Sequence, residues 1–284
     1  MRQERAIWLV ANEASGSNSR DALDALEDCC GRTGFRVAHR TYFPQDELPS
    51  PDVLDAAGID TVAIFAGDGT INAALENLSG WSGSALVLPG GTMNLLYHRL
   101  HGQLEMEEVL ERVSAGKAER RRPGLIRCAA GAAYAGLMAG PGTSWYNVRE
   151  AMRDADVIDI ASGTMDALNE TLDGPQIACV EPELGRREGY PLLLCNPTDK
   201  GIELVAFHAE TASEYAAQTL ALLKRDFREG PHDTLGTADL LRFASQDGAE
   251  YGLLIDGEAA KGTSEMEFTL ACADVDLLST QYDD

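Results

Sequence analysis

The chain has 284 residues, enough for one large domain or two ordinary ones, and its 44% hydrophobic and 24% charged composition is typical of a folded globular protein. Its formal net charge of -23 at pH 7 opposes long-range attraction to nucleic acid or to an anionic membrane surface. The apolar run at residues 6–11 is too short for a signal sequence, and no run approaches the roughly 20 residues that span a bilayer. We therefore expect a cytoplasmic protein.

The six cysteines and five histidines show no metal-binding spacing. Cys29 and Cys30 are adjacent, the other four cysteines are scattered without a C-x-x-C pair, and His98 and His101 have no second pair of ligands nearby. We expect buried free thiols and no zinc site.

The first hundred residues alternate short apolar runs with longer amphipathic segments, which is typical of βα units around a parallel sheet. The predicted strands are residues 6–11, 35–42, 61–65 and 85–88, and the predicted helices are residues 22–30, 71–78 and 94–100. We therefore predict an α/β domain with a parallel sheet over residues 1–120.

The composition changes at the basic stretch KAERRRP, residues 117–123, and the βα alternation ends there. Residues 212–227 have the pattern of a helix or a long crossover, and the acidic segment 154–173 that of a helix or a surface insert. We predict a mainly β sandwich domain over residues 121–284, with the tail from about 270 a candidate to return to the first domain. The clearest strand patterns in this half are at 192–195, 203–208, 251–255 and 265–271.

Three glycine-rich turns each follow a predicted strand and precede a predicted helix: NEASGS at 12–17, AGDGTIN at 66–72 and PGGTMN at 89–94. Glycine permits close backbone approach, and the N-terminus of a helix presents unpaired N–H groups at the positive end of its dipole. Because the carboxyl ends of parallel strands share one edge of a sheet, the three turns can converge on one nucleotide. Each turn alone is better explained as a tight βα connection, whereas the three together favour phosphate binding.

Other phosphate-binding patterns are absent from the sequence. There is no GxxxxGK[ST] segment, no GxGxxG after the first strand, and no HRD and DFG pair of the protein kinases.

The motif AGDGTIN, followed about one βα unit later by LPGGTMN, resembles the paired GGDGT and PLGT-x-N signatures of the diacylglycerol, sphingosine and NAD kinase superfamily. ANEASGS resembles the NPxSG loop of the lipid kinases. LLIDGEAAKGT resembles their DGE segment, which favours the bacterial lipid-kinase branch over the NAD kinases. The resemblance implies a two-domain enzyme that binds ATP between an α/β domain and a β sandwich into which the lipid inserts.

The resemblance also assigns residues to roles. Near the phosphates or in the nucleotide loops it places Asn12, Ser15, Gly16, Gly67, Asp68, Gly69, Thr70, Gly91, Thr92 and Asn94. The segment CNPTDKGIELVAF is similar to the family segment that supplies magnesium ligands, which nominates Asp199, and Glu258 of the DGE matches the proton acceptor.

Phosphoryl transfer needs such groups, because Mg²⁺ bridges phosphate oxygens while a carboxylate takes the proton of the acceptor hydroxyl. Asp68 and Asp199 suit the metal or its water, and Glu258 suits the base. Without the other motifs, Asp256 and Glu258 would be solvated carboxylates of a surface hairpin. Asp199 would be a turn residue that bonds its own backbone.

The sequence departs from the family pattern at several positions. Glu13 replaces a proline, Ser17 a common lysine, Ala66 a glycine and Leu95 a common aspartate, and residues 122–124 read RPG where DLG is frequent. Arg120, Arg121 and Arg122 could supply the missing positive charge or form a solvated linker, and Trp145 and Tyr146 could line a lipid entrance or belong to the core.

We expect an ATP- and Mg²⁺-dependent kinase that phosphorylates the hydroxyl of diacylglycerol, a long-chain base or a related lipid. Its expected partners are the lipid substrate and, transiently, a membrane surface, with a homodimer as an option and no nucleic acid. The alternatives are an NAD-kinase-like small-molecule kinase and a nucleotide- or lipid-binding protein with little turnover.

Overall fold

The computed structural model describes residues 4–12, 20–144, 174, 176–207 and 232–281. The chain divides into two compact units. Unit 1 comprises Met1–Pro123 and Cys272–Asp284, and unit 2 comprises Gly124–Ala271. The segments expected at 154–173 and 212–227, together with Glu13, Ser15, Gly16, Ser17, Trp145 and Tyr146, lie outside the described residues.

Unit 1 is an α/β domain with one sheet of six strands, in the order β2-β1-β3-β4-β18-β5. Its elements are β1 (Arg5–Ala11), α1 (Arg20–Thr33), β2 (Phe35–Tyr42), α2 (Pro51–Ala56), β3 (Thr61–Ala66), α3 (Asp68–Asn77), β4 (Ser84–Pro89), α4 (Leu95–His101), α5 (Met106–Ser114), β5 (Glu119–Arg121) and β18 (Asp276–Ser279). The first four strands are parallel to one another, which confirms the predicted fold class of this half.

The centre of this sheet is apolar because helices cover it. All six residues of β3 are buried, as expected for a strand of a parallel sheet with both faces covered. Helix α1 buries Leu23, Leu26 and Cys30 at helical spacing. Its Arg32 bonds Glu107 of α5 at 2.9 Å, which ties these two helices together.

The order in which strands are added to the sheet reverses after β2. Strand β2 lies on one side of β1, and β3 lies on the other. The connections that leave β1 and β3 therefore diverge, and a crevice at the carboxyl ends of these two strands is the usual ligand position of an open α/β sheet.

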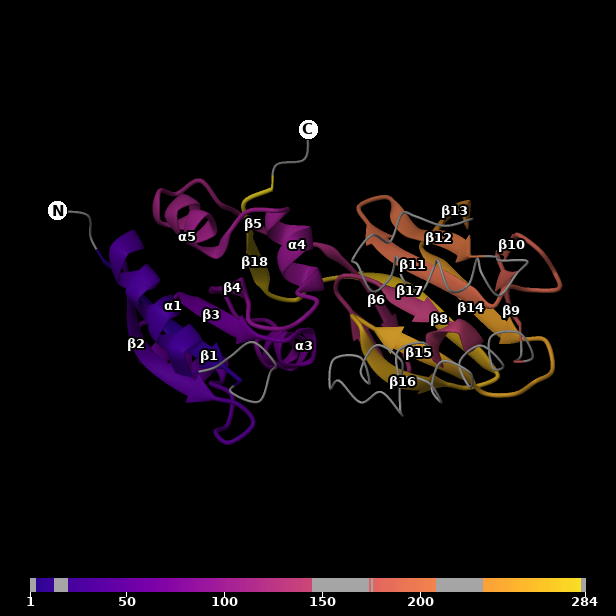
Figure 1. The fold of residues 1–284 in the computed structure, drawn as a ribbon, viewed down its shortest axis with the longest axis horizontal. Coiled ribbons are helices and arrows are strands. Elements are labelled where there is room, and N and C mark those ends of the chain that lie inside the picture. Colours follow the sequence, from indigo (N-terminus) through magenta and orange to yellow (C-terminus); the bar gives the residue numbers. More distant parts are fainter. Residues whose placement is uncertain (1–3, 13–19, 145–173, 175, 208–231, 282–284) are drawn as a thin grey trace. The chain divides into compact units, whose positions relative to one another are not determined.

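The C-terminal strand β18 completes the sheet of unit 1, between β4 and β5 (Figure 1). It runs parallel to β4 and antiparallel to β5. The N–H of Ala273 donates to the carbonyl of Pro123 at 3.0 Å, so the two chain segments that join the units lie side by side.

Unit 2 is built from two sheets of six strands, with the orders β10-β9-β14-β17-β6-β7 and β13-β12-β11-β8-β15-β16 (Figure 1). Its elements are β6 (Gly124–Cys128), β7 (Gly131–Ala133), β8 (Leu137–Ala139), η1 (Pro141–Ser144), β9 (Ile177–Glu181), β10 (Glu183–Leu184), β11 (Leu192–Thr198), β12 (Gly201–Phe207), β13 (His232–Ala238), β14 (Leu240–Ser245), β15 (Tyr251–Ile255), β16 (Glu258–Gly262) and β17 (Glu265–Cys272).

The main core of unit 2 includes Phe243 and Phe268, whose ring centroids lie 4.7 Å apart, and Leu193 of β11. Because side chains alternate along a strand, the neighbours Leu192 and Leu194 point to the opposite face of the sheet. There they pack with three further apolar side chains, which makes this face apolar too. This second cluster consists of Leu192, Val205 and Phe207, with Met138 and Leu194 partly buried against it.

All six cysteines are free, and four of them are buried as expected, whereas Cys128 is half-buried and Cys272 is exposed, so the expectation is wrong for Cys272. Within the described residues, no group of three or more His, Cys, Asp or Glu side chains is arranged to hold a metal ion. No helix in the described part of the chain is long and apolar enough to cross a membrane.

Candidate functional site

The loops after β1 and β3 are joined at the point where the chain reverses direction. Asn12 directly follows β1, and its Nδ2 donates to Thr70 Oγ1 at 2.9 Å. Thr70 is buried in the first turn of α3. The structure thus brings together two of the predicted nucleotide residues that are 58 positions apart in sequence.

The central loop AGDGT leads from β3 into α3 without a side-chain cap. Gly67 is the N-cap residue, with φ -77° and ψ 165°, and no side chain caps the helix there. Gly69, two residues on, is exposed. The positive end of this ten-residue helix therefore stands at the carboxyl edge of the sheet, where anions are stabilised.

Asp68 is buried to 5% exposure, and it connects the beginnings of two helices. It lies in the first turn of α3, and its Oδ1 accepts a long hydrogen bond, 3.4 Å, from the N–H of Leu96 in the first turn of α4. A carboxylate at a helix N-terminus is stabilised by the helix dipole. Asp68 therefore has a structural role in addition to the predicted chemical one.

The glycines of the PGGT loop allow it to pack on the AGDGT loop. A Cβ at Gly91 would lie 2.6 Å from the Cα of Gly67, and a Cβ at Gly90 would lie 2.4 Å from the backbone nitrogen of Ala66. These distances are shorter than van der Waals contact. The close approach of the two loops by itself therefore explains the two glycines, without a ligand.

Asn94 stabilises the same loop from within. It is the N-cap residue of α4 and adopts a left-handed conformation, φ 51°, which Asn tolerates better than most residues. Its Oδ1 accepts from the N–H of Gly91 at 2.7 Å, and its Nδ2 donates to the carbonyl of Gly91 at 3.0 Å. The amide of Asn94 is thus used in the loop, whereas Thr92 is exposed.

In unit 2, Glu258 is exposed and lies directly after a two-residue turn. Ile255 of β15 pairs with Glu258 of β16, which leaves Asp256 (φ 49°) and Gly257 (φ 85°) as the turn. Two positive φ angles define a type I′ hairpin, for which Asp-Gly is a favoured pair. Glu258 therefore opens β16 rather than ending β15.

The alternative that Asp256 is a solvated carboxylate is wrong. Asp256 is 1% exposed, and its carboxylate accepts hydrogen bonds from backbone N–H groups of the β7–β8 connection. The Asp-Gly pair after an apolar strand signalled the hairpin in the sequence. The partners of the carboxylate are 120 or more residues away, so no local signal could have found them.

Asp199 lies exposed in the two-residue turn between β11 and β12. Hydrogen bonds of this turn are made by Thr198, whose Oγ1 donates to the carbonyl of Gly201 at 2.7 Å and accepts from the N–H of Lys200 at 3.2 Å. Asp199 could give one oxygen ligand to a metal, and its role as a ligand stays a prediction.

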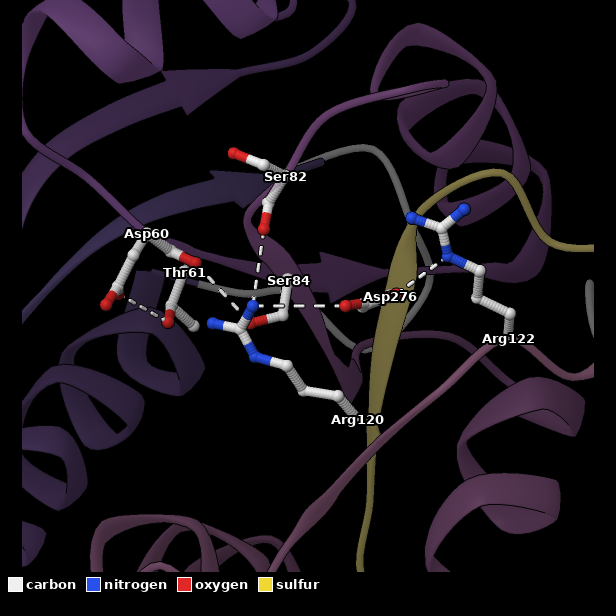
Figure 2. Close-up of polar contacts among 7 residues, drawn as sticks. All are labelled: Asp60, Thr61, Ser82, Ser84, Arg120, Arg122 and Asp276. Carbon is white, nitrogen blue, oxygen red and sulfur yellow. Dashed lines mark hydrogen bonds and ion pairs between the residues drawn. The ribbon is translucent and has the colours of Figure 1, made fainter.

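The arginines of the KAERRRP stretch lie at the wrong end of the sheet to replace a phosphate-binding lysine of the loops in unit 1. Arg122 Nε donates to Asp276 Oδ1 at 2.7 Å, and Arg120 Nη1 donates to the carbonyl of Ser82 at 3.2 Å (Figure 2). Asp276 pairs with Ser84, the first residue of β4. The glycine-rich turn lies at the other end of β4. From Ser84 to the last residue of that strand the distance is roughly 17 Å, at about 3.3 Å per residue.

The alternative of a freely solvated linker is wrong as well. Arg121 bonds Glu119 at 2.9 Å, Arg120 lies 3.9 Å from Asp276, and both arginines belong to strand β5. Strand β5 pairs with the C-terminal strand β18, and the contact of Arg120 with Asp276 adds to this attachment, whereas the Arg121–Glu119 pair lies within β5.

Comparison with known proteins connects these loops to one family. Residues 6–125 match the model of the diacylglycerol kinase catalytic domain, which confirms the resemblance found in the motifs. No curated protein sequence matches the chain.

Two similar crystal structures are of Bacillus anthracis strain Sterne proteins designated diacylglycerol kinases. The first has 13% sequence identity and a TM-score of 0.59, covering 98% of this chain and 96% of the other. The second has 12% identity and a TM-score of 0.59, covering 98% of both chains. At these identities the likeness establishes the fold, an α/β domain followed by a domain of antiparallel strands.

Proposed function

From the match of residues 6–125 to the diacylglycerol kinase catalytic domain, we propose that the protein is an ATP-dependent kinase that phosphorylates a lipid hydroxyl. The observation that supports the proposal is that the second and third glycine-rich turns and Asn12, the described residue of the first turn, lie together at one edge of the sheet of unit 1. Asn12 and Thr70 join the first turn to the second, and Gly67 and Gly91 pack the second against the third.

The nucleotide is assigned to the edge where α3 begins. The N–H groups of its first turn and its dipole favour phosphate oxygens, and the exposed Gly69 offers no side chain that would keep a phosphate away. Mg²⁺ bound with ATP neutralises phosphate charge. We assign Asp68 of unit 1 to this ion or its water, as a single carboxylate, and Asp199 of unit 2 remains a proposed metal ligand.

Glu258 is assigned as the base. In the transfer step, the oxygen of the acceptor hydroxyl bonds to the γ-phosphorus, the bond from that phosphorus to the oxygen bridging it to the β-phosphate breaks, and ADP leaves. The hydroxyl proton passes to a carboxylate, for which an exposed glutamate next to a rigid turn is suited.

An apolar substrate is proposed from the family match, whereas the second cluster of unit 2 is buried and forms a small core of its own. A sandwich sheet normally alternates apolar inward and polar outward side chains, whereas β11 and β12 carry apolar residues on both faces. A net charge of -23 repels an anionic surface, so contact of this cytoplasmic protein with a membrane would have to be local and peripheral.

A second candidate is a nucleotide-binding protein with little turnover. Leu95 stands where many family members have an aspartate, and Arg120 and Arg122 pair with Asp276 at the opposite end of the sheet. They therefore do not compensate within unit 1 for a missing lysine. A third candidate function is that of an NAD-kinase-like enzyme.

The test is transfer of labelled phosphate from MgATP to a panel of acceptors, with the product identified. The panel holds diacylglycerol, a long-chain base and ceramide in mixed micelles, and NAD in detergent-free buffer. A labelled lipid is the expected product. Labelled NAD would identify a small-molecule kinase, and ATP binding without any labelled product would identify a protein that has lost turnover.

A further inference from the structure

The buried carboxylate of Asp256 holds the β15–β16 turn against the connection between β7 and β8. Asp256 Oδ2 accepts from the N–H of Tyr134 at 2.7 Å, and Oδ1 accepts from the N–H groups of Ala135 at 2.7 Å and Gly136 at 2.9 Å. The N–H of Asp256 in turn donates to the carbonyl of Gly136 at 3.0 Å. These four hydrogen bonds join the turn to the connection between β7 and β8.

The arrangement is strong for physical reasons. Hydrogen bonds to an ionised acceptor are roughly twice as strong as neutral ones, and at 1% exposure water does not compete for them. Asp256 also holds φ 49°, which Asp tolerates better than most residues. Removal of the acceptor would leave three N–H groups to find new partners.

The carboxylate oxygens of Asp256 already serve three backbone donors, so they are poorly placed to take a proton from a substrate. Glu258, by contrast, is exposed. Only Gly257 separates the two residues, and Glu258 is held on its own side by pairing with Ile255. We therefore expect a shift of the Asp256 backbone to be passed through Gly257 and Ile255 to the backbone of Glu258.

We propose that Asp256 is a positioning residue: its bonds to the Tyr134–Gly136 backbone hold the turn that fixes Glu258 for proton transfer. The inference rests on the proposed function for its kinetic consequence, because it requires Glu258 to be the base. The structural half, that the carboxylate holds both segments rigid, does not depend on any activity.

The test uses Asp256→Asn in the full chain. Asparagine keeps the size and the tolerance for positive φ, but its Nδ2 would face an N–H group where the wild-type oxygen accepts one. Asp247→Asn is the matched control. Asp247 also lies in a turn and accepts from the N–H of Ala249 at 2.9 Å, but it is exposed and lies between β14 and β15.

Hydrogen exchange followed by mass spectrometry is the readout that needs no activity. We expect exchange of peptides containing residues 133–137 and 255–259 to rise by about tenfold or more in Asp256→Asn, and to keep its wild-type rate in Asp247→Asn. Wild-type exchange of both segments in Asp256→Asn would overturn the inference, whether or not the protein proves to be a kinase.

The kinetic readout is a double-mutant cycle with Glu258→Gln on the identified acceptor. Asp256→Asn alone should lower kcat by about ten- to a hundredfold with the KM for ATP nearly unchanged, because a misplaced base loses roughly this factor. In the Glu258→Gln background the same change should cost little, since the base is already gone. Equal losses in both backgrounds would show that Asp256 acts independently of Glu258, against the inference. If Glu258→Gln turned over at the wild-type rate, Glu258 would not be the base and the kinetic consequence proposed for Asp256 would be wrong. The hydrogen-exchange result would still decide whether the carboxylate holds the two segments rigid.

Discussion

The side-chain amide of Asn12 donates to Thr70 Oγ1 at 2.9 Å, across the point where the sheet of unit 1 reverses its chain direction. The bond joins the loop after β1 to the first turn of α3. Because two loops that must both reach one phosphate chain have to keep a fixed separation, this bond is a candidate determinant of nucleotide affinity.

Thr70→Val removes this hydrogen bond while keeping the shape of the side chain. We expect the free energy of unfolding to fall by about 1 kcal/mol and ATP to bind several-fold more weakly, because the hydrogen bond between Asn12 and residue 70 is lost. Urea unfolding and titration calorimetry measure the two effects.

The matched control for Thr70→Val is Thr61→Val. Thr61 is also buried and bonds Asp60 at 2.9 Å, but it lies at the amino end of β3 (Figure 2). This control should lose a similar stability with unchanged ATP affinity. Equal affinity losses in the two variants would refute a specific role for the Asn12–Thr70 bond.

Gly91→Ala tests the packing of the two glycine-rich loops. The added methyl would lie 2.6 Å from the Cα of Gly67, so the backbone must move, and we expect a loss of about 1–3 kcal/mol in the free energy of unfolding. Gly31→Ala in α1 is the control, since nothing lies within 4 Å of its added methyl. This change should stabilise the protein by about 0.5–1 kcal/mol through helix propensity. A Gly91→Ala protein as stable as wild type would contradict the close approach.

Gly69→Val tests the nucleotide assignment itself. Gly69 is exposed, so the fold should be retained, while the branched side chain covers the N–H groups at the beginning of α3. We expect the Kd for ATP to rise by about tenfold or more, equivalent to ~1.4 kcal/mol. Calorimetry on this variant and on Gly31→Val, a second exposed helical glycine, provides the comparison. The assignment is wrong if Gly69→Val binds ATP as tightly as wild type.

Much of unit 1 could be predicted from the sequence, because its strands and helices have strong local periodicity. Strand β2 has the predicted bounds, and β1, β3 and β4 differ from them by one residue at one or both ends. Helix α5 was missed, although Val109, Leu110 and Val113 recur at helical spacing and could have revealed it.

The edge of the sheet could not be predicted, for a physical reason. Strand β5 reads Glu-Arg-Arg and β18 has only four residues, so neither carries a local strand signal. The two strands pair along a backbone ladder, and the adjoining contact between Arg122 and Asp276 joins residues 154 positions apart. In the candidate site, the motifs located the loops. Within these loops, Gly91 packs against Gly67 and Asn94 bonds the backbone of Gly91, and no motif specifies these three-dimensional contacts.

His101 should make the stability of unit 1 depend on pH. It is 1% exposed at the end of α4, and its Nδ1 lies 2.9 Å from Thr280 Oγ1 of the C-terminal segment. Burial lowers the pKa of its imidazole from 6.5 to about 4, against a smaller opposing effect of the Val87 carbonyl. Between these two values the unfolded chain binds a proton that the folded chain does not, so stability falls as the pH falls from about 6.5 to 4.

The full effect of His101 is about 3 kcal/mol, from 1.36 kcal/mol per pKa unit. Urea unfolding at pH 7 and pH 4.5 measures it in wild type and in His101→Asn. The variant should lose less free energy of unfolding than wild type over this interval, since the carboxylates contribute equally to both proteins. An equal loss in the two proteins would show that His101 does not titrate as described.

The catalytic assignment predicts that Glu258 and Asp68 fail in different ways. Glu258→Gln keeps the size of the side chain but removes its basicity, so ATP binding should stay near normal. Asp68→Asn should disturb both MgATP binding and turnover, because Asp68 lies in the first turn of α3 and bonds the N–H of Leu96. Comparing ATP affinity and kcat for the two variants separates the roles.

The most direct measurement of the central claim is kcat of Glu258→Gln for phosphoryl transfer from MgATP to the best lipid acceptor of the panel. General-base catalysis contributes roughly a hundred- to ten-thousandfold, and we predict a loss of that order with an unchanged Kd for ATP. Turnover of the variant at the wild-type rate would contradict the account. Glu258 would then be a solvated residue beside a hairpin turn, and the proton acceptor would have to be another group, with Asp68 the next candidate.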